Sequence, residues 1–95
     1  MIPKQFKHII PANSVDNFLQ EVFDEVGKAE EKFPLWPKSL SIGMQIINEE
    51  MGEANKAALD CEFRRDELKN VRTELVQTAA MCIRQIAAID CNFML

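Results

Sequence analysis

Histidine and paired cysteines, the usual ligands of zinc, are almost absent from this sequence of 95 residues. His8 is the single histidine, and Cys61, Cys82 and Cys91 form no C-x-x-C pair. A zinc site built from histidine and cysteine is therefore not expected. Because the number of cysteines is odd, a disulfide framework is also disfavoured, and we expect reduced thiols in a cytoplasmic protein.

The chain also lacks a long apolar run and an excess of positive charge. Its first residues, MIPKQFKHIIPAN, contain no stretch typical of a signal peptide, and no segment resembles a membrane span. The net charge of −4 argues against a nucleic-acid partner, because phosphate contacts favour a basic protein face. We therefore expect neither a membrane nor a nucleic acid as a partner.

What is present is the composition of one small folded domain, residues 1–95. The chain is 47% hydrophobic and 27% charged, which is typical of a folded protein rather than a disordered one. A chain of this length buries only about 60 to 65% of its unfolded surface, so self-association would stabilise it. Residues 1–12 contain Pro3 and Pro11 and no clear period, which predicts an extended arm.

Apolar residues follow a helical period in the first half of the chain. We expect a helix with an N-cap at Asn13 or Ser14 that fades near Lys32. Residues 33–38 predict a loop, since Pro34 and Pro37 bracket Leu35 and Trp36. The apolar face of this first helix would consist of Val15, Phe18, Leu19, Val22, Phe23 and Val26.

Two further helices are predicted, and the fold class is all-α. The second begins after Ser39 or Ser41 and ends near Asp60, and each of its glycines, Gly43 and Gly52, costs about 1 kcal/mol relative to alanine. The third runs from about residue 67 to about residue 90, with Asp66 as its cap. Its predicted core stripe is Leu68, Val71, Leu75, Ala79, Cys82, Ile83 and Ile86, and the residues expected to let two chains approach closely are Ala79, Ala80, Ala87 and Ala88.

Two polar patterns stand on either side of the charged segment 61–66. Glu50-x-x-Glu53 and Glu74-x-x-Gln77 both have the i, i+3 spacing that places two side chains on one helical face. If the chain turns between them, the patterns are symmetric about that turn. With a rise of about 1.5 Å per residue, Glu53 and Glu74 would each lie about 16 Å from it. Four oxygen-bearing side chains would then converge, as in a site for a hard cation.

The surrounding residues extend these patterns. Residues 46–57, IINEEMGEANKA, contain an E-E-x-G-E-x-x-K-A pattern, and residues 72–81, RTELVQTAAM, contain an E-L-x-Q segment. Residues 31–37, EKFPLWP, form an aromatic and proline-rich loop. Over roughly residues 15 to 90 the chain resembles the MazG-like family of all-α nucleoside triphosphate pyrophosphohydrolases. It differs from that family at Gln77, where aspartate is usual.

The resemblance implies an enzyme that uses Mg²⁺, or Mn²⁺, to cleave a (deoxy)nucleoside triphosphate into the monophosphate and pyrophosphate. The implied metal ligands are Glu50, Glu53, Glu74 and Gln77. Glu49 or another carboxylate would accept a proton from the attacking water, so the implied catalytic residues are Glu49, Glu50, Glu53 and Glu74. Lys56 would contact a phosphate and Trp36 would stack on a base. The family also implies a four-helix-bundle-like core, completed by a homodimer or homotetramer.

Each of these residues has an alternative interpretation. Lys56 is spaced to form an ion pair with Glu53, three residues before it, and Trp36 could plug the core instead. Gln77 still offers a carbonyl oxygen to a metal, but it removes one negative charge from the site. A second hypothesis follows, in which the chain is a catalytically weak helical interaction module derived from the same fold.

Overall fold

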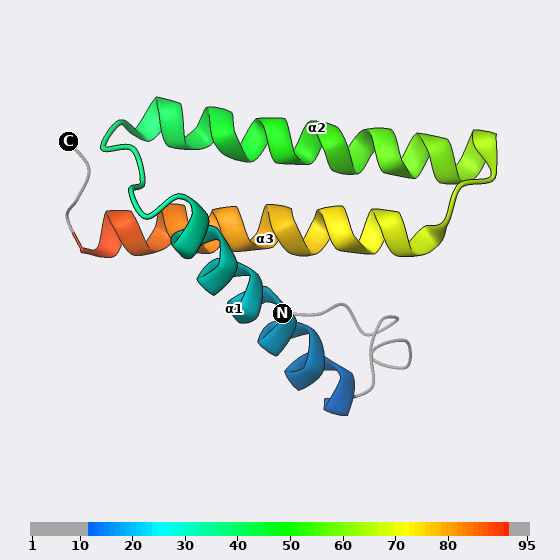
Figure 1. Cartoon of the computed structure of the whole chain (residues 1–95), viewed down its shortest axis with the longest axis horizontal. Helices are drawn as coiled ribbons and strands as arrows, with labels where there is room; N and C mark the ends of the chain where they lie inside the picture. The colour runs from blue at the N-terminus through cyan, green and yellow to red at the C-terminus, as the bar shows by residue number, and fades with distance from the viewer. Residues whose placement is uncertain (1–11, 92–95) are drawn as a thin grey trace.

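The computed structural model describes residues 12–91, which form three helices (Figure 1). They are α1 (Ala12–Lys32), α2 (Leu40–Arg64) and α3 (Leu68–Asp90). The described residues contain no strand, which confirms the all-α class. The predicted arm lies outside the described residues except for Ala12, which begins α1.

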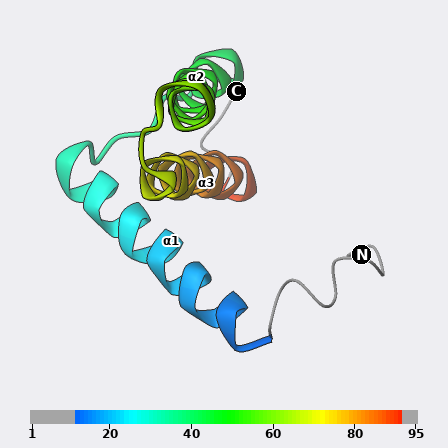
Figure 2. The same ribbon diagram turned by 90° about the vertical axis from the view of Figure 1, so that its right-hand side faces the viewer.

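The second and third helices form an antiparallel hairpin, and the first crosses it. α2 and α3 lie side by side in both views, whereas α1 runs obliquely past α3 (Figures 1 and 2). In the described part of the chain, no Cα atom of α1 lies within 8 Å of one in α2. The hairpin is therefore the structural unit, and α1 joins it on the side of α3.

The helix ends differ in detail from the predicted ones. α2 continues to Arg64, four residues beyond its predicted end at Asp60, because the left-handed Arg65 (φ 57°) terminates it instead. Ser39 caps its start, where its hydroxyl accepts a hydrogen bond from the backbone N–H of Ile42 at 3.3 Å. Residues 61–64 of the charged segment thus form the last turn of α2, and the chain turns at residues 65–67.

The predicted caps of the other two helices are also displaced. α1 begins at Ala12, so Asn13 and Ser14 lie within the helix rather than before it. At the start of α3 the N-cap is Glu67, whose side chain makes no capping hydrogen bond. Asp66 stabilises this end from one position earlier, because its Oδ1 accepts from the Glu67 backbone N–H at 2.8 Å and from the Asn70 amide at 3.2 Å.

The core of a single chain is thin and made of small side chains. Among the described residues the buried apolar ones are Val22, Ala54, Ala80 and Ala88, and no large side chain is fully buried. Three members of the predicted stripe of α3 are exposed in the single chain: Leu68 is 73% exposed, Leu75 48% and Ile86 57%. Its other four members, Val71, Ala79, Cys82 and Ile83, are half-buried. The buried residues of α3 are instead Thr78, Ala80, Arg84, Gln85 and Ala88.

Two of the alanines expected at a contact between two chains are buried within the single chain. Ala80 is 0% and Ala88 4% exposed, so neither can form the close approach that we predicted between two copies. Ala79 is half-buried and Ala87 exposed. None of the described helices has the length and apolar character that crossing a membrane requires.

A buried glutamine and a buried arginine of α3 hold the connection between α1 and α2. Gln85 accepts a hydrogen bond from Trp36 Nε1 at 2.8 Å and donates one to the Leu40 carbonyl at 3.2 Å. Arg84 donates to the Phe33 carbonyl at 2.6 Å, and its guanidinium lies 4.9 Å from the centre of the Trp36 ring. Residues 33–40 are thereby tied to the last turns of α3.

This arrangement explains one of the two glycines in α2. A Cβ atom at Gly43 would lie 2.1 Å from Gln85 Oε1, so only glycine allows the helices to approach with Gln85 between them. Gly52 faces open space, where a Cβ would meet nothing within 4 Å. Gly43 thus has a packing reason, and Gly52 is a tolerated helix residue.

Candidate functional site

Three carboxylates converge between the two helices of the hairpin. Glu50 and Glu53 project from successive turns of α2 and Glu74 from α3, and one oxygen of each lies within 4.8 Å of the others. Residues 65–67 connect the two helices, so Glu53 lies eleven residues before the end of α2 and Glu74 six residues after the start of α3. The two residues are therefore not equally far from the observed turn, but the predicted convergence of Glu50, Glu53 and Glu74 is seen.

The local environment of two of these carboxylates, Glu50 and Glu74, disfavours their negative charge. Glu50 Oε2 and Glu74 Oε2 are buried and have no hydrogen-bond partner among the described residues. Burial raises the pKa of Glu50, and the charges of Glu53, Glu74, Glu25 and Glu49 raise it further. The pKa of Glu74 is also raised, first by burial and then by Glu53. Such a group is stabilised by a proton or by a cation placed between the carboxylates.

The donor set fits a hard divalent cation. Mg²⁺ prefers carboxylate and carbonyl oxygens and keeps several waters of its own. Three carboxylates from two rigid helices supply such oxygens, and two of those oxygens have no other polar partner. Carboxylate clusters also occur on protein surfaces without any ion, so the partnerless buried oxygens are the more informative feature.

Gln77 and Glu49 flank this cluster in different ways. Gln77 is half-buried on α3, one turn beyond Glu74, and lines with Glu50 a cavity of about 250 Å³ between α1 and α3. Glu49 is exposed on α2 and does not belong to the group of converging carboxylates. The proximity of Gln77 to Glu50 is consistent with its predicted place, whereas its role as a ligand and that of Glu49 as a base stay predictions.

Lys56 and Trp36, the predicted substrate contacts, both have partners within the chain. Lys56 Nζ lies 3.0 Å from Asp60 Oδ2, one turn further along α2, rather than beside Glu53 as the alternative interpretation expected. It still lines a pocket with Glu53 and Glu74. Trp36 is half-buried and lies against Arg84, at the end of the hairpin away from the turn.

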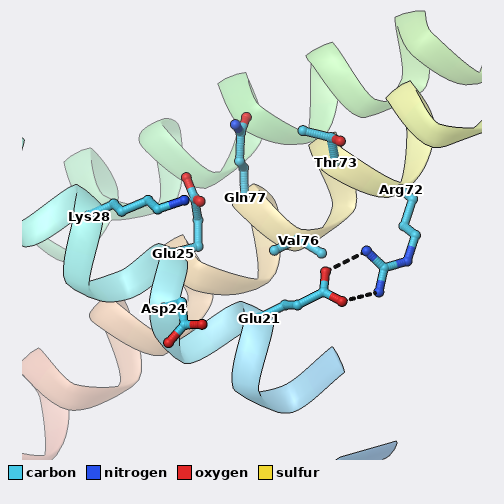
Figure 3. Close-up of a pocket in the computed structure, with 8 residues that line it drawn as sticks. All are labelled: Glu21, Asp24, Glu25, Lys28, Arg72, Thr73, Val76 and Gln77. Carbon is cyan, nitrogen blue, oxygen red and sulfur yellow. Dashed lines mark hydrogen bonds and ion pairs between the residues drawn. The ribbon is translucent and has the colours of Figure 1, made fainter. Parts of the chain in front are cut away.

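The first helix brings residues to the site that the sequence patterns did not indicate. Glu21 of α1 accepts two hydrogen bonds from the Arg72 guanidinium of α3, at 2.5 and 2.8 Å, which link the two helices (Figure 3). Glu25 and Lys28 then face Gln77 across the α1–α3 seam (Figure 3). The sequence does not predict these positions of Glu21, Glu25 and Lys28, because the polar face of an amphipathic helix is normally exposed to solvent.

Comparisons of the chain with models of protein families, with curated proteins and with solved structures found no match. The resemblance to the MazG-like family therefore rests on the motif residues alone.

Proposed function

We propose that the chain is a Mg²⁺-dependent nucleoside triphosphate pyrophosphohydrolase that cleaves the bond between the α- and β-phosphates. The observation that carries this proposal is the convergence of Glu50, Glu53 and Glu74, with two buried oxygens that lack a partner. The motif resemblance supports the same reaction, because three of its acidic residues are those that converge. Mn²⁺ would serve in place of Mg²⁺.

The three glutamates hold the cation in this proposal, with the Gln77 carbonyl as a neutral fourth ligand. A bound Mg²⁺ would neutralise phosphate charge and lower the pKa of an attacking water. In this proposal Glu49, an exposed residue next to Glu50 in α2, accepts the proton of that water. Lys56 balances the negative charge of the pocket that it shares with Glu53 and Glu74.

The active form in this proposal is a homodimer or homotetramer that completes a four-helix-bundle-like core. The thin core of the single chain supports self-association, since burying large apolar side chains is the main source of stability. α1 contributes Phe18, Leu19 and Phe23 to the exposed apolar surface, and the hairpin helices contribute Leu40, Ile42, Met44, Met51, Leu59, Phe63, Leu68, Leu75, Ile86 and Ile89.

The proposed reaction is tested by pyrophosphate release from a panel of ribo- and deoxyribonucleoside triphosphates. We expect release in Mg²⁺ and none in EDTA. Glu53→Gln should lower the rate by more than the roughly 10–100-fold that loss of a residue supporting a metal ligand costs. Glu62→Gln is the matched control, because Glu62 is an exposed glutamate of the same helix outside the cluster.

Two results would contradict the proposal. The first is the absence of release from every nucleotide, which would favour the helical interaction module with its exposed apolar surface. The second is an equal rate in Glu53→Gln and Glu62→Gln, which would place any hydrolysis outside the carboxylate cluster.

A further inference from the structure

The cavity between α1 and α3 is lined by charges of both signs. Its volume is about 250 Å³, and its acidic groups are Glu25 and Glu50, the latter a member of the carboxylate cluster. Its basic groups are Lys28 and Lys32 of α1 and Arg84 of α3. Cations and carboxylates therefore share one space of a size suited to a small ligand group.

The basic groups of this cavity have no anionic partner within the described chain. No described carboxylate lies within 4.0 Å of a nitrogen of Lys28, Lys32 or Arg84. The Lys32 ammonium lies only near the Phe33 ring, 5.5 Å from its centre. The two lysines are four residues apart on one helical face, so both reach the cavity from the same side.

Arg84 is the most unusual of these groups. Arg84 is only 7% exposed, although its guanidinium is charged. Its contacts within the chain are a hydrogen bond to the Phe33 carbonyl and the face of the Trp36 ring, and neither group is an anion. Buried charges in proteins are normally paired or bound to a ligand. Because Arg84 lines the cavity, an anion in that cavity would supply the missing partner.

A simple anion would satisfy the basic groups but would be repelled by Glu25 and Glu50. An anion that arrives with a divalent cation meets both requirements, since the cation lies at the carboxylates and the anion extends toward the lysines. Phosphate groups suit the basic part, because arginine and lysine form charge-assisted hydrogen bonds with their oxygens.

We infer that this cavity is the polyphosphate subsite of the enzyme, with Lys28, Lys32 and Arg84 as its phosphate contacts. The inference rests on the proposed function and adds that α1, which carries neither acidic pattern, supplies substrate-binding residues. It assigns to Arg84 two tasks, holding the 33–40 connection and presenting a fixed positive charge to the substrate.

The test is calorimetric titration with inorganic triphosphate in excess Mg²⁺, for the full chain and for the double variant Lys28→Gln, Lys32→Gln. Both lysines are exposed, so their replacement leaves the fold intact, whereas Arg84 is avoided because it holds the connection. We expect the double variant to bind triphosphate at least about tenfold more weakly, since charge-assisted contacts are worth that factor or more. Lys69→Gln is the control, because Lys69 pairs with Glu67 on the surface at 3.0 Å and should leave the affinity unchanged.

The outcomes separate this inference from the proposed reaction. Equal triphosphate affinity in the double variant and wild type would overturn the subsite, even if pyrophosphate release is observed. Lysine-dependent binding of triphosphate without hydrolysis of any nucleotide would support the subsite and contradict the pyrophosphohydrolase. If wild type binds no triphosphate in Mg²⁺, the subsite is overturned whatever the activity. An unchanged response to Mg²⁺ alone in the double variant would show that the carboxylate cluster is intact.

Discussion

Glu50 and Glu21 illustrate how two carboxylates of one chain can respond to pH in opposite directions. The pKa of Glu50 is raised, so between its unfolded and folded pKa values the folded state holds a proton that the unfolded state has lost. Its contribution to stability is therefore present at low pH and lost as pH rises through the folded pKa. The pKa of Glu21 is lowered, mainly by the hydrogen bond from Arg72, so its contribution is lost as pH falls.

We predict that Glu50→Gln stabilises the metal-free protein. In EDTA near pH 7 the substitution removes a buried charge that Glu53 and Glu74 repel, and should raise the free energy of unfolding by on the order of 1 kcal/mol. The advantage should shrink as pH falls, because Glu50 of the wild type then takes up a proton. Urea denaturation near pH 7 and at a lower pH measures this.

Glu74→Gln should behave in the same way, because the pKa of Glu74 is also raised by burial and by Glu53. Glu21→Gln is the contrasting variant, in which no gain near pH 7 is expected since its charge is paired with Arg72. A clear loss of metal-free stability in both Glu50→Gln and Glu74→Gln would mean that these residues support the fold rather than a cation.

At the scale of the helices, the features that depend on residues close together in the sequence could be predicted. The period of apolar residues gave three helices, and the i, i+3 pairs gave the face on which Glu50, Glu53 and Glu74 meet. The course of α1 depends on contacts distant in sequence: Arg72 with Glu21, and Arg84 with Phe33. Such contacts leave no period in the sequence, so neither they nor the lysine-lined cavity could be predicted.

The glycines of α2 provide a matched test of the helix packing. Gly43→Ala would place its Cβ against Gln85, whose amide is hydrogen-bonded at both ends, and should cost about 1 to 3 kcal/mol as overpacking does. Gly52→Ala should instead stabilise the protein by up to about 1 kcal/mol, because it gains helix propensity in open space.

Thermal unfolding measures both glycine variants, and the fluorescence of the single tryptophan reports the contact between Trp36 and Gln85. Only Gly43→Ala should change the emission. Equal stability of the two variants would contradict the role assigned to Gly43.

Over the whole molecule, one chain buries some of the residues predicted as core, such as Val22, and leaves several others exposed. The stripe of α3 follows the helical period correctly, yet Leu68 and Ile86 are more than half exposed. A sequence period indicates that a face will be buried, but not whether the same chain buries it. The extra apolar area is the physical reason to expect a second copy.

We therefore predict that the protein self-associates at micromolar concentrations. Its mass in solution should be two or four times 10.9 kDa, as measured by light scattering during size-exclusion chromatography. The melting temperature should rise with protein concentration, since association stabilises the folded state by mass action. A monomer whose melting is independent of concentration would contradict the completed bundle.

The most direct test of the cation site is the melting temperature of wild type, Glu53→Gln and Glu62→Gln during a titration with Mg²⁺. A ligand present at 100 times its dissociation constant stabilises the native state by about 2.7 kcal/mol. For a domain of this size each kcal/mol corresponds to roughly 4–8 °C. We predict a rise of several degrees in wild type and Glu62→Gln, and the loss of most of that rise in Glu53→Gln. Unchanged melting of the wild type in millimolar Mg²⁺, or an equal rise in Glu53→Gln, would contradict a cation site at these glutamates.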